Sequence, residues 1–210
     1  MNPDVEPCWE SSALITIDLQ RDFLSDGAFG VPGTTEVLPA VRDVVRAFRG
    51  AGRPIIHAVR LYLADGSNAD ISRRQRIRAG ASIVRPGTPG SELAPDLLPA
   101  QVSIDADSLL RGELQPAGDG EHILFKPRWN AFYATPLDAF LRSQHVNTVV
   151  VVGCNYPNCP RGTLFGASER DYRAVAVSDA TSRWTSSAAE ELAGIGIDVA
   201  DSRFVVGALR

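Results

Sequence analysis

The chain has 210 residues, 44% of them apolar, which is enough for one full-sized hydrophobic core, and we expect a single domain over residues 1–210. The formal net charge is −4 without any block of like charges, so we expect neither nucleic acid nor a membrane surface as a partner. No apolar run approaches the ~20 residues of a membrane span, and the first residues lack the basic start and apolar stretch of a signal peptide, so we expect a cytoplasmic protein.

Strands and helices alternate along most of the chain. In the first part of the chain, apolar runs and helical spacing predict a strand over 11–19, a helix over 34–52 and a strand over 53–61. An irregular Gly- and Pro-rich stretch follows over 62–121, with a short helix near 93–98. Regular elements then return: strands over 121–126, 147–154 and 173–180 and a last strand within 197–206, which alternate with helices over 135–146, 158–171 and 186–196. The strands are apolar without alternation, which is typical of parallel strands covered on both faces. We therefore predict an α/β fold with a doubly wound, mostly parallel, Rossmann-like six-stranded sheet and helices on both faces.

Three residues with useful chemistry follow predicted strands. Asp18 ends the first strand, Lys126 ends the strand at 121–126, and Cys159 comes shortly after the valine run of 147–154. In an open parallel sheet, ligands bind beyond the carboxyl ends of the strands. Each residue also has a plain structural explanation: Asp18 as a turn cap, Lys126 as an exposed cation and Cys159 as a small core residue. The chain has twenty arginines and this single lysine, so Lys126 stands where a compact ammonium suits better than a planar fork.

The cysteines could form a disulfide, hold a metal, pack in the core or supply a nucleophile. Three cysteines make an odd number, which speaks against a disulfide framework. Cys154 and Cys159 are spaced C-x4-C and the three histidines are scattered, so the sequence does not predict a zinc site, and we expect no metal. Asn158 can cap a helix that begins at Cys159, and the positive end of that helix should lower the pKa of the thiol. Cys154 closes a buried strand and is expected to pack inside.

Three blocks of the sequence carry a family resemblance. "ALITIDLQRDFL" (13–24), "FKPRWNAFYATPLDAFLR" (125–142) and "VVVVGCNYPNCPRGTLFGASERDYRAVAVSDAT" (149–181) resemble, in order and spacing, the isochorismatase-like cysteine hydrolases. The resemblance implies the doubly wound sheet and a catalytic triad of Asp18, Lys126 and Cys159. It also implies a cis peptide at Cys154–Asn155 and an oxyanion hole formed by the backbone N–H groups of Asn155 and Cys159. The "CNYPNCP" loop departs from the usual family pattern, so the substrate does not carry over.

The resemblance and the residue types together predict the chemistry. Asp18 takes the thiol proton, Lys126 orients the pair, and the thiolate attacks a carbonyl to form a thioester. The cysteine favours cleavage of a C–N bond in a small amide, ureido, N-carbamoyl or lactam substrate, without a cofactor. Alternatives are a vinyl-ether hydrolase of the isochorismatase type and a non-catalytic ligand-binding or redox-sensing relative. Nicotinamidases generally carry Asp-x-His after the second strand, and 59–70 offers no histidine. Five aromatic residues are candidates for substrate binding, or else core: Phe23, Tyr62, Trp129, Phe132 and Tyr156.

A basic cluster, "RRQRIR" (73–78), lies in the irregular stretch. One interpretation is a solvated helical face. Another is a flap whose arginines bind a substrate carboxylate, because the guanidinium fork pairs bidentately with carboxylates. A third is a subunit interface with Ile71 and Ile77 as its apolar contacts, since the family resemblance implies a homo-oligomer.

Overall fold

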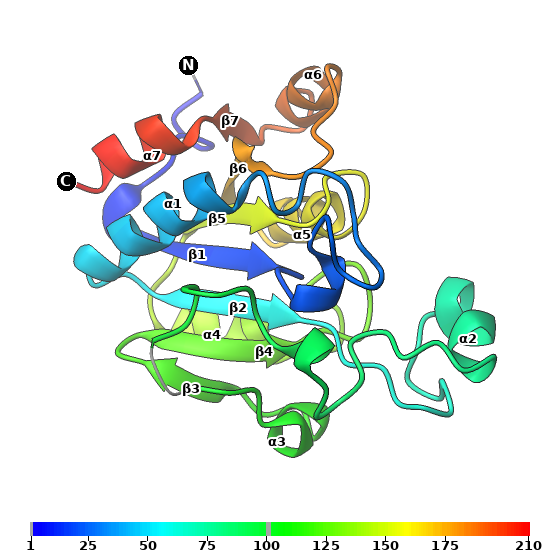
Figure 1. Cartoon of the computed structure of the whole chain (residues 1–210). Helices are drawn as coiled ribbons and strands as arrows, with labels where there is room; N and C mark the ends of the chain where they lie inside the picture. Colours follow the sequence, from blue (N-terminus) through cyan, green and yellow to red (C-terminus); the bar gives the residue numbers. More distant parts are fainter. Residues whose placement is uncertain (1, 100–101) are drawn as a thin grey trace.

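The computed structural model describes residues 2–99 and 102–210 and is built around one seven-stranded sheet in the order β3-β4-β2-β1-β5-β6-β7 (Figure 1). The strands are β1 (Ser12–Ile17), β2 (Ile55–Val59), β3 (Gln115–Gly118), β4 (Glu121–Phe125), β5 (Thr148–Gly153), β6 (Arg173–Thr181) and β7 (Asp198–Ala200). Every neighbouring pair is parallel except β3 with β4. The predicted α/β class and mostly parallel sheet are therefore confirmed.

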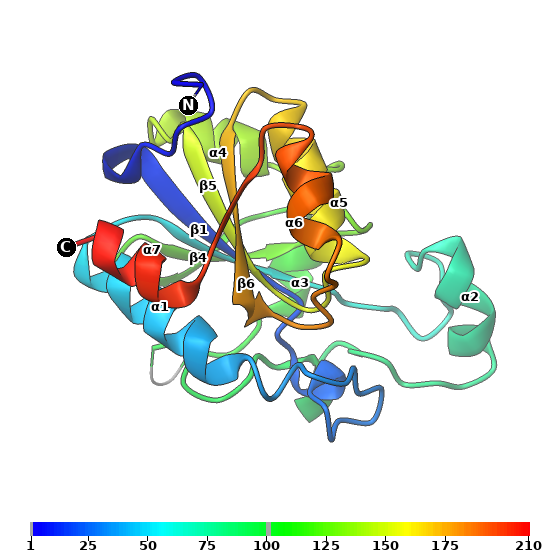
Figure 2. The same cartoon turned by 90° about the horizontal axis from the view of Figure 1, so that it is seen from above.

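Helices cover both faces of the sheet (Figure 2). They are α1 (Leu38–Gly50), α2 (Ile71–Arg78), α3 (Ala106–Leu110), α4 (Leu137–Ser143), α5 (Cys159–Ser168), α6 (Ala188–Ala193) and α7 (Ser202–Ala208), with short 3₁₀ turns η1 (Trp9–Ser11), η2 (Arg21–Phe23) and η3 (Pro89–Ser91). Helices α1 and α7 lie side by side on one face, and α4, α5 and α6 lie on the other. The sheet is thus the middle layer of three.

The three layers enclose two hydrophobic cores, one on each face of the sheet. Leu14 of β1 points into the cluster under α1, whereas Ile15 points into the cluster under α4 and α5. All six residues of β1 and all six of β5 are buried, as expected for central parallel strands. Helix α1 turns one apolar stripe to the sheet, with Val41, Val44 and Phe48 fully buried at helical spacing.

The sheet has seven strands rather than the predicted six. The additional strand, β3, pairs antiparallel with β4 at the edge of the sheet. Its sequence, Gln-Pro-Ala-Gly, carries a proline and a glycine that weaken a strand signal, and an edge is where such residues are tolerated. Backbone pairing with β4, rather than its own propensity, makes it a strand.

Two further predictions of the secondary structure are wrong. No helix forms at the described residues near 93–98, because Leu93 pairs with Gln20 in an isolated β-bridge and two prolines, Pro95 and Pro99, flank the rest. The last predicted strand, within 197–206, is short. Asp201 caps a helix there by accepting the Phe204 backbone N–H at 2.7 Å, so the chain turns into α7. Residues 100 and 101 of the predicted irregular stretch lie outside the described residues.

Residues 61–92, here called the arm, project from the carboxyl edge of the sheet and carry α2 (Figure 1). Strands β1, β2, β4 and β5 all point toward the side from which the arm projects. Ile77 of α2 is buried in the core, whereas Ile71 at its start is 87% exposed. In residues 2–99 and 102–210, no helix has the length and apolarity needed to cross a membrane.

Candidate active site

The ends of β1 and β4 bring a carboxylate and an ammonium together. Asp18 directly follows β1 and Lys126 directly follows β4, and both still hydrogen-bond to β2. The Asp18 N–H donates to Ala58 O and the Lys126 N–H donates to Val59 O, both at 2.9 Å. Asp18 has a left-handed backbone with φ of 51°. Lys126 Nζ donates to Asp18 Oδ2 at 2.7 Å, and both side chains are buried. The second oxygen of Asp18, Oδ1, is buried with no hydrogen-bond partner among the described residues.

The third predicted residue, Cys159, is the first residue of α5, as predicted. Asn158 occupies the N-cap position, but its side chain makes no capping hydrogen bond, contrary to the prediction. Its side chain is buried. Burial raises the pKa of the Cys159 thiol and the charge of Asp18 raises it further, whereas Lys126 and Arg60 act in the opposite direction. The expected low pKa is therefore wrong, because burial and the neighbouring carboxylate outweigh the helix terminus. The resting pair is a thiol beside a carboxylate that can accept its proton.

Sequence reasoning missed Arg60, the first residue after β2. Its guanidinium is buried and donates to Pro127 O at 2.9 Å and to Asp70 Oδ2 at 3.4 Å. Nη2 lies 3.9 Å from the Cys159 sulfur. The predicted strand over 53–61 placed Arg60 inside the strand. With the strand ending at Val59, Arg60 follows the same pattern as Asp18 and Lys126, and this would have identified it.

The loop between β5 and α5 has the predicted cis peptide at Cys154–Asn155. Gly153 precedes it with φ of 124°, and a Cβ atom there would lie 2.2 Å from the Ile17 carbonyl oxygen, so only glycine lets β5 end so close to β1. Among the described residues, the backbone N–H groups of Asn155 and Cys159 donate to no protein acceptor. Cys154 packs inside as expected, and burial raises its pKa to about 11.

Two of the five aromatic candidates lie next to Arg60. The Tyr62 hydroxyl donates to Asp70 Oδ2 at 2.8 Å, and the Arg60 guanidinium lies 5.8 Å from the Tyr62 ring centre. The Trp129 ring centre is 5.1 Å from the same guanidinium and 4.7 Å from that of Arg73. Trp129 is therefore covered by two cations, one from the sheet edge and one from the arm.

The other three aromatic candidates pack in the cores. Phe132 stacks on Tyr172 with ring centres 5.7 Å apart, and Tyr156 packs on Trp184 at 4.7 Å. Phe23 belongs to the cluster on the face covered by α1. All three side chains are buried.

A pocket of about 470 Å³ opens beside the first turns of α5. Its lining residues are Trp129, Pro157, Asn158, Arg161, Gly162 and Phe165. Trp129 connects this mostly apolar pocket to Arg60, and Asn158 adjoins Cys159. Asp18, Lys126, Arg60 and Cys159 are not among its lining residues.

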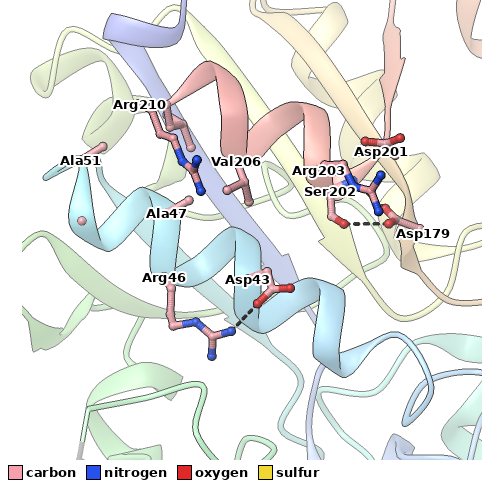
Figure 3. A pocket seen from close by; sticks show the side chains of 12 residues that line it. Asp43, Arg46, Ala47, Ala51, Asp179, Asp201, Ser202, Arg203, Val206 and Arg210 are labelled. Atoms are coloured by element: carbon pink, nitrogen blue, oxygen red, sulfur yellow. Dashed lines mark hydrogen bonds and ion pairs between the residues drawn. The ribbon is translucent and has the colours of Figure 1, made fainter.

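A larger pocket, about 1010 Å³, lies elsewhere, between α1 and α7 (Figure 3). Its polar side chains bind one another: Arg46 pairs with Asp43, and Ser202 donates to Asp179 at 2.7 Å. No reacting residue predicted from the sequence lines it. Across residues 2–99 and 102–210, no three His, Cys, Asp or Glu side chains are grouped so that they could hold a metal ion.

Comparison with known families identifies the family of this chain. The profile described as the Isochorismatase domain matches residues 12–105 and 102–201 of the chain. The chain belongs to the isochorismatase family of hydrolases. The match covers the strands whose ends carry Asp18, Arg60, Lys126 and the Cys159 loop.

Individual isochorismatase-family relatives extend over most of the chain. A protein of Arabidopsis thaliana named a probable inactive nicotinamidase is 33% identical over 180 residues, which are 84% of this chain and 83% of that protein. The ureidoacrylate amidohydrolase RutB of Pantoea ananatis (strain LMG 20103) is 30% identical over 182 residues, 82% of this chain and 69% of its own. The crystal structure of an isochorismatase family protein from Desulfovibrio vulgaris has a TM-score of 0.79 and 33% identity, and the match covers 95% of this chain and 98% of the other.

Proposed function

We propose that this chain is a cysteine hydrolase that cleaves a C–N bond of a small amide, ureido, N-carbamoyl or lactam substrate through a thioester. Asp18 is the base, Lys126 holds the base in place, and Cys159 is the nucleophile. The observation that carries the proposal is the buried Lys126–Asp18 pair, 2.7 Å apart, with the buried Cys159 thiol close enough for the charges of both groups to act on its pKa. A thiol beside a base that can take its proton can form a covalent acyl intermediate, and Asp18 is such a base.

In the first step, the thiol proton moves from the Cys159 sulfur to Asp18 while the sulfur bonds to the substrate carbonyl carbon. The carbonyl π electrons move to oxygen, which becomes an oxyanion. The backbone N–H groups of Asn155 and Cys159 are available to donate to it, since neither has a protein acceptor among the described residues. The ammonium of Lys126 keeps the Asp18 carboxylate directed at the sulfur.

In the second step, the oxyanion collapses and the C–N bond breaks. Asp18 returns its proton to the leaving nitrogen, and a thioester to Cys159 is left. Water then loses a proton to Asp18 and attacks the thioester carbon. The C–S bond breaks, the thiol regains its proton, and the acid product leaves.

Two observations favour ureido substrates with a carboxylate. A relative at 30% identity is named a ureidoacrylate amidohydrolase, and such a compound carries both a ureido group and a carboxylate. The Arg73 guanidinium of the arm lies 4.7 Å from the ring centre of Trp129, which lines the pocket, and the Arg73 side chain is 30% exposed, so it is the candidate to bind a ligand carboxylate.

The test is a panel of small amides, ureas, N-carbamoyl amino acids, ureido acids and lactams, assayed with the wild type, Cys159→Ala and Cys8→Ala. Cys8→Ala is the matched control because it removes a free thiol that lies outside the site. We expect turnover by the wild type and the control, and none above background by Cys159→Ala. Peptide mass spectrometry should detect a hydroxylamine-sensitive acyl adduct on Cys159.

The alternatives predict different results in the same experiment. A vinyl-ether hydrolase would leave every C–N substrate intact. A redox-sensing protein would form a reversible Cys154–Cys159 disulfide under mild oxidant, and it would show no acyl adduct. Either result would overturn the proposed amide hydrolysis.

A further inference from the structure

Arg60 is a buried cation in contact with the reacting sulfur, and the mechanism above does not use it. Its Nη2 lies 3.9 Å from Cys159 Sγ, and its side chain is 1% exposed. Nη1 is held by Pro127 O and Asp70 Oδ2, and Nε is buried without a partner among the described residues. A guanidinium in such surroundings keeps its charge at every accessible pH.

The need for a second cation follows from the movement of charge in the first step. At rest, the negative charge lies on Asp18, where Lys126 neutralises it at 2.7 Å. When the S–H bond breaks and the new O–H bond forms on Asp18, this charge moves to the sulfur. A buried, unpaired thiolate would be strongly disfavoured. Arg60 contacts the atom on which the charge arrives.

We propose that Arg60 is a catalytic residue of this site, whose guanidinium stabilises the negative charge that forms on the Cys159 sulfur when the thiol proton passes to Asp18. The inference rests on the proposed function. The step is a proton transfer only, since the S–H bond breaks, the O–H bond on Asp18 forms, and nothing is oxidised or reduced. Asp70 is a positioning residue that holds the guanidinium beside the sulfur.

The surroundings of Arg60 support this role. Asp70 is buried and accepts from the Tyr62 hydroxyl at 2.8 Å and the Ser72 hydroxyl at 2.6 Å, as well as from Arg60. Burial raises the pKa of Asp70, but these hydrogen bonds and the charges of Arg73 and Arg60 hold it below its usual range. The carboxylate thus stays ionised and keeps the guanidinium in place at neutral pH.

The test measures the thiol directly. The pH titration of thiolate absorbance near 240 nm is compared between each protein and its Cys159→Ser counterpart, so that only Cys159 contributes to the difference. We expect Arg60→Gln and Arg60→Met to raise the pKa of Cys159 by about 1–3 pH units, the range for loss of an opposite charge at this distance. Their kcat/KM on the best ureido substrate should fall about tenfold to a thousandfold.

Three variants keep the test decisive. Arg60→Met fills the site without an unpaired polar atom, so it is informative if Arg60→Gln does not fold. Arg60→Lys keeps a cation and should titrate closer to the wild type than either neutral variant. Arg128→Gln is the matched control, because Arg128 also donates to Pro127 O, at 2.7 Å, and has no recorded contact with the sulfur. It should leave the thiol titration unchanged.

The outcomes separate this inference from the proposed function. Neutral Arg60 variants with an unchanged titration and unchanged kcat/KM would overturn the role of Arg60, even if the wild type hydrolyses ureides through Cys159. A shift in Arg60→Lys as large as in the neutral variants would also overturn it, because charge would not be the cause. A raised thiol pKa in the neutral variants of a protein that hydrolyses no C–N substrate would support the coupling of Arg60 to the sulfur and reject the proposed function.

Discussion

The position of Lys126 suits the compact ammonium of a lysine better than the planar guanidinium of an arginine. It is the only lysine beside twenty arginines, and its side chain is completely buried with Nζ directed at Asp18. Nζ also donates to the backbone oxygen of Arg128 at 3.4 Å. A compact ammonium fits between these two acceptors, whereas a planar guanidinium needs more room.

We predict that Lys126→Arg keeps the fold but loses about a hundredfold or more in kcat on the best substrate. The larger head displaces Asp18 from the thiol, and displacements of about 1 Å are enough for a loss of this size. The unfolding free energy should fall by only about 1–3 kcal/mol, the usual cost of overpacking. Urea denaturation and steady-state kinetics measure the two effects. Near wild-type kcat in Lys126→Arg would contradict the fit described here.

At the scale of elements, the four arginines of α2 have different surroundings. Arg73 lies over Trp129 and pairs with Asp70 at 3.5 Å. Arg76 lies over Phe29 at 5.0 Å, Arg74 donates to Ala69 O, and Arg78 donates to Asp65 O. Only Arg73 faces the candidate site. Arg74 and Arg78 make hydrogen bonds within the arm, and Arg76 contacts the neighbouring loop that carries Phe29.

We predict that Arg73→Ala raises KM for ureido acids about tenfold or more, the effect of losing one charge-assisted hydrogen bond. KM for neutral amides should change little. Arg76→Ala is the matched control on the same helix and should leave both values near wild type. An equal effect of the two substitutions, or an equal effect on acidic and neutral substrates, would argue against a carboxylate anchor on α2.

Helix α1 is tied to the sheet by a buried carboxylate. Glu121 of β4 accepts from Arg49 Nη2 at 2.9 Å and faces His57 Nε2 at 3.4 Å. Burial raises the pKa of Glu121, but the hydrogen bonds and charges of Arg49 and His57 outweigh it and lower the pKa to about 2. A folded pKa below the unfolded value of 4.5 adds stability above pH 4.5, and this is lost as pH falls toward 2.

We predict that Glu121→Gln removes part of the acid-dependent loss of stability. The wild type should lose about 3 kcal/mol through this group between pH 4.5 and 2, and the variant should lack that slope. Urea denaturation at several pH values gives both curves. Glu113→Gln is the control: the pKa of Glu113 is also lowered to about 2 by Arg111 and Ser108, but the pair is solvent-exposed and should matter far less. Parallel curves for wild type and Glu121→Gln would refute the assignment.

At the scale of the whole molecule, the arm determines which apolar surface is available to a partner. Ile77 packs in the chain's own core and so is not available for an interface, contrary to the interpretation that used both isoleucines. Ile71, the first residue of α2, is 87% exposed. Ile71 is thus the isoleucine of α2 that is accessible for contact between copies of the chain.

We propose that the protein is a homo-oligomer with Ile71 at the contact. The wild type should elute above its monomer mass of 22.5 kDa in size-exclusion chromatography with light scattering. Ile71→Asp should shift the mass toward the monomer at low protein concentration, because a carboxylate is costly to bury in an apolar contact. Ile195→Asp alters another exposed isoleucine, 41% exposed, and should leave the mass unchanged. A monomeric wild type would contradict the proposal.

The sequence by itself was sufficient for the order of the main elements and for the placement of three site residues. Parallel strands that alternate with helices must end at one edge, so Asp18, Lys126 and Cys159 could be placed together without coordinates. The sequence signal failed where local propensity is weak. The edge strand β3 exists because β4 supplies its hydrogen bonds, and α7 replaces most of a predicted strand because Asp201 caps a helix.

Only the tertiary structure decided the properties that depend on neighbours distant in sequence. The strand-end pattern could have marked Arg60 as a candidate, but its contact with Cys159, 99 positions away in the chain, is set by the fold. The raised pKa of Cys159 likewise arises from burial and from Asp18, which act through packing and outweigh the helix terminus that the sequence did predict. Ile71 and Ile77 are the same residue type on one helix, yet one is exposed and the other buried, because the path of the arm sets which side of α2 meets the core. The local sequence specifies which chemical groups are present. The pKa of a group, its exposure and its contacts depend on all the residues that the fold brings around it.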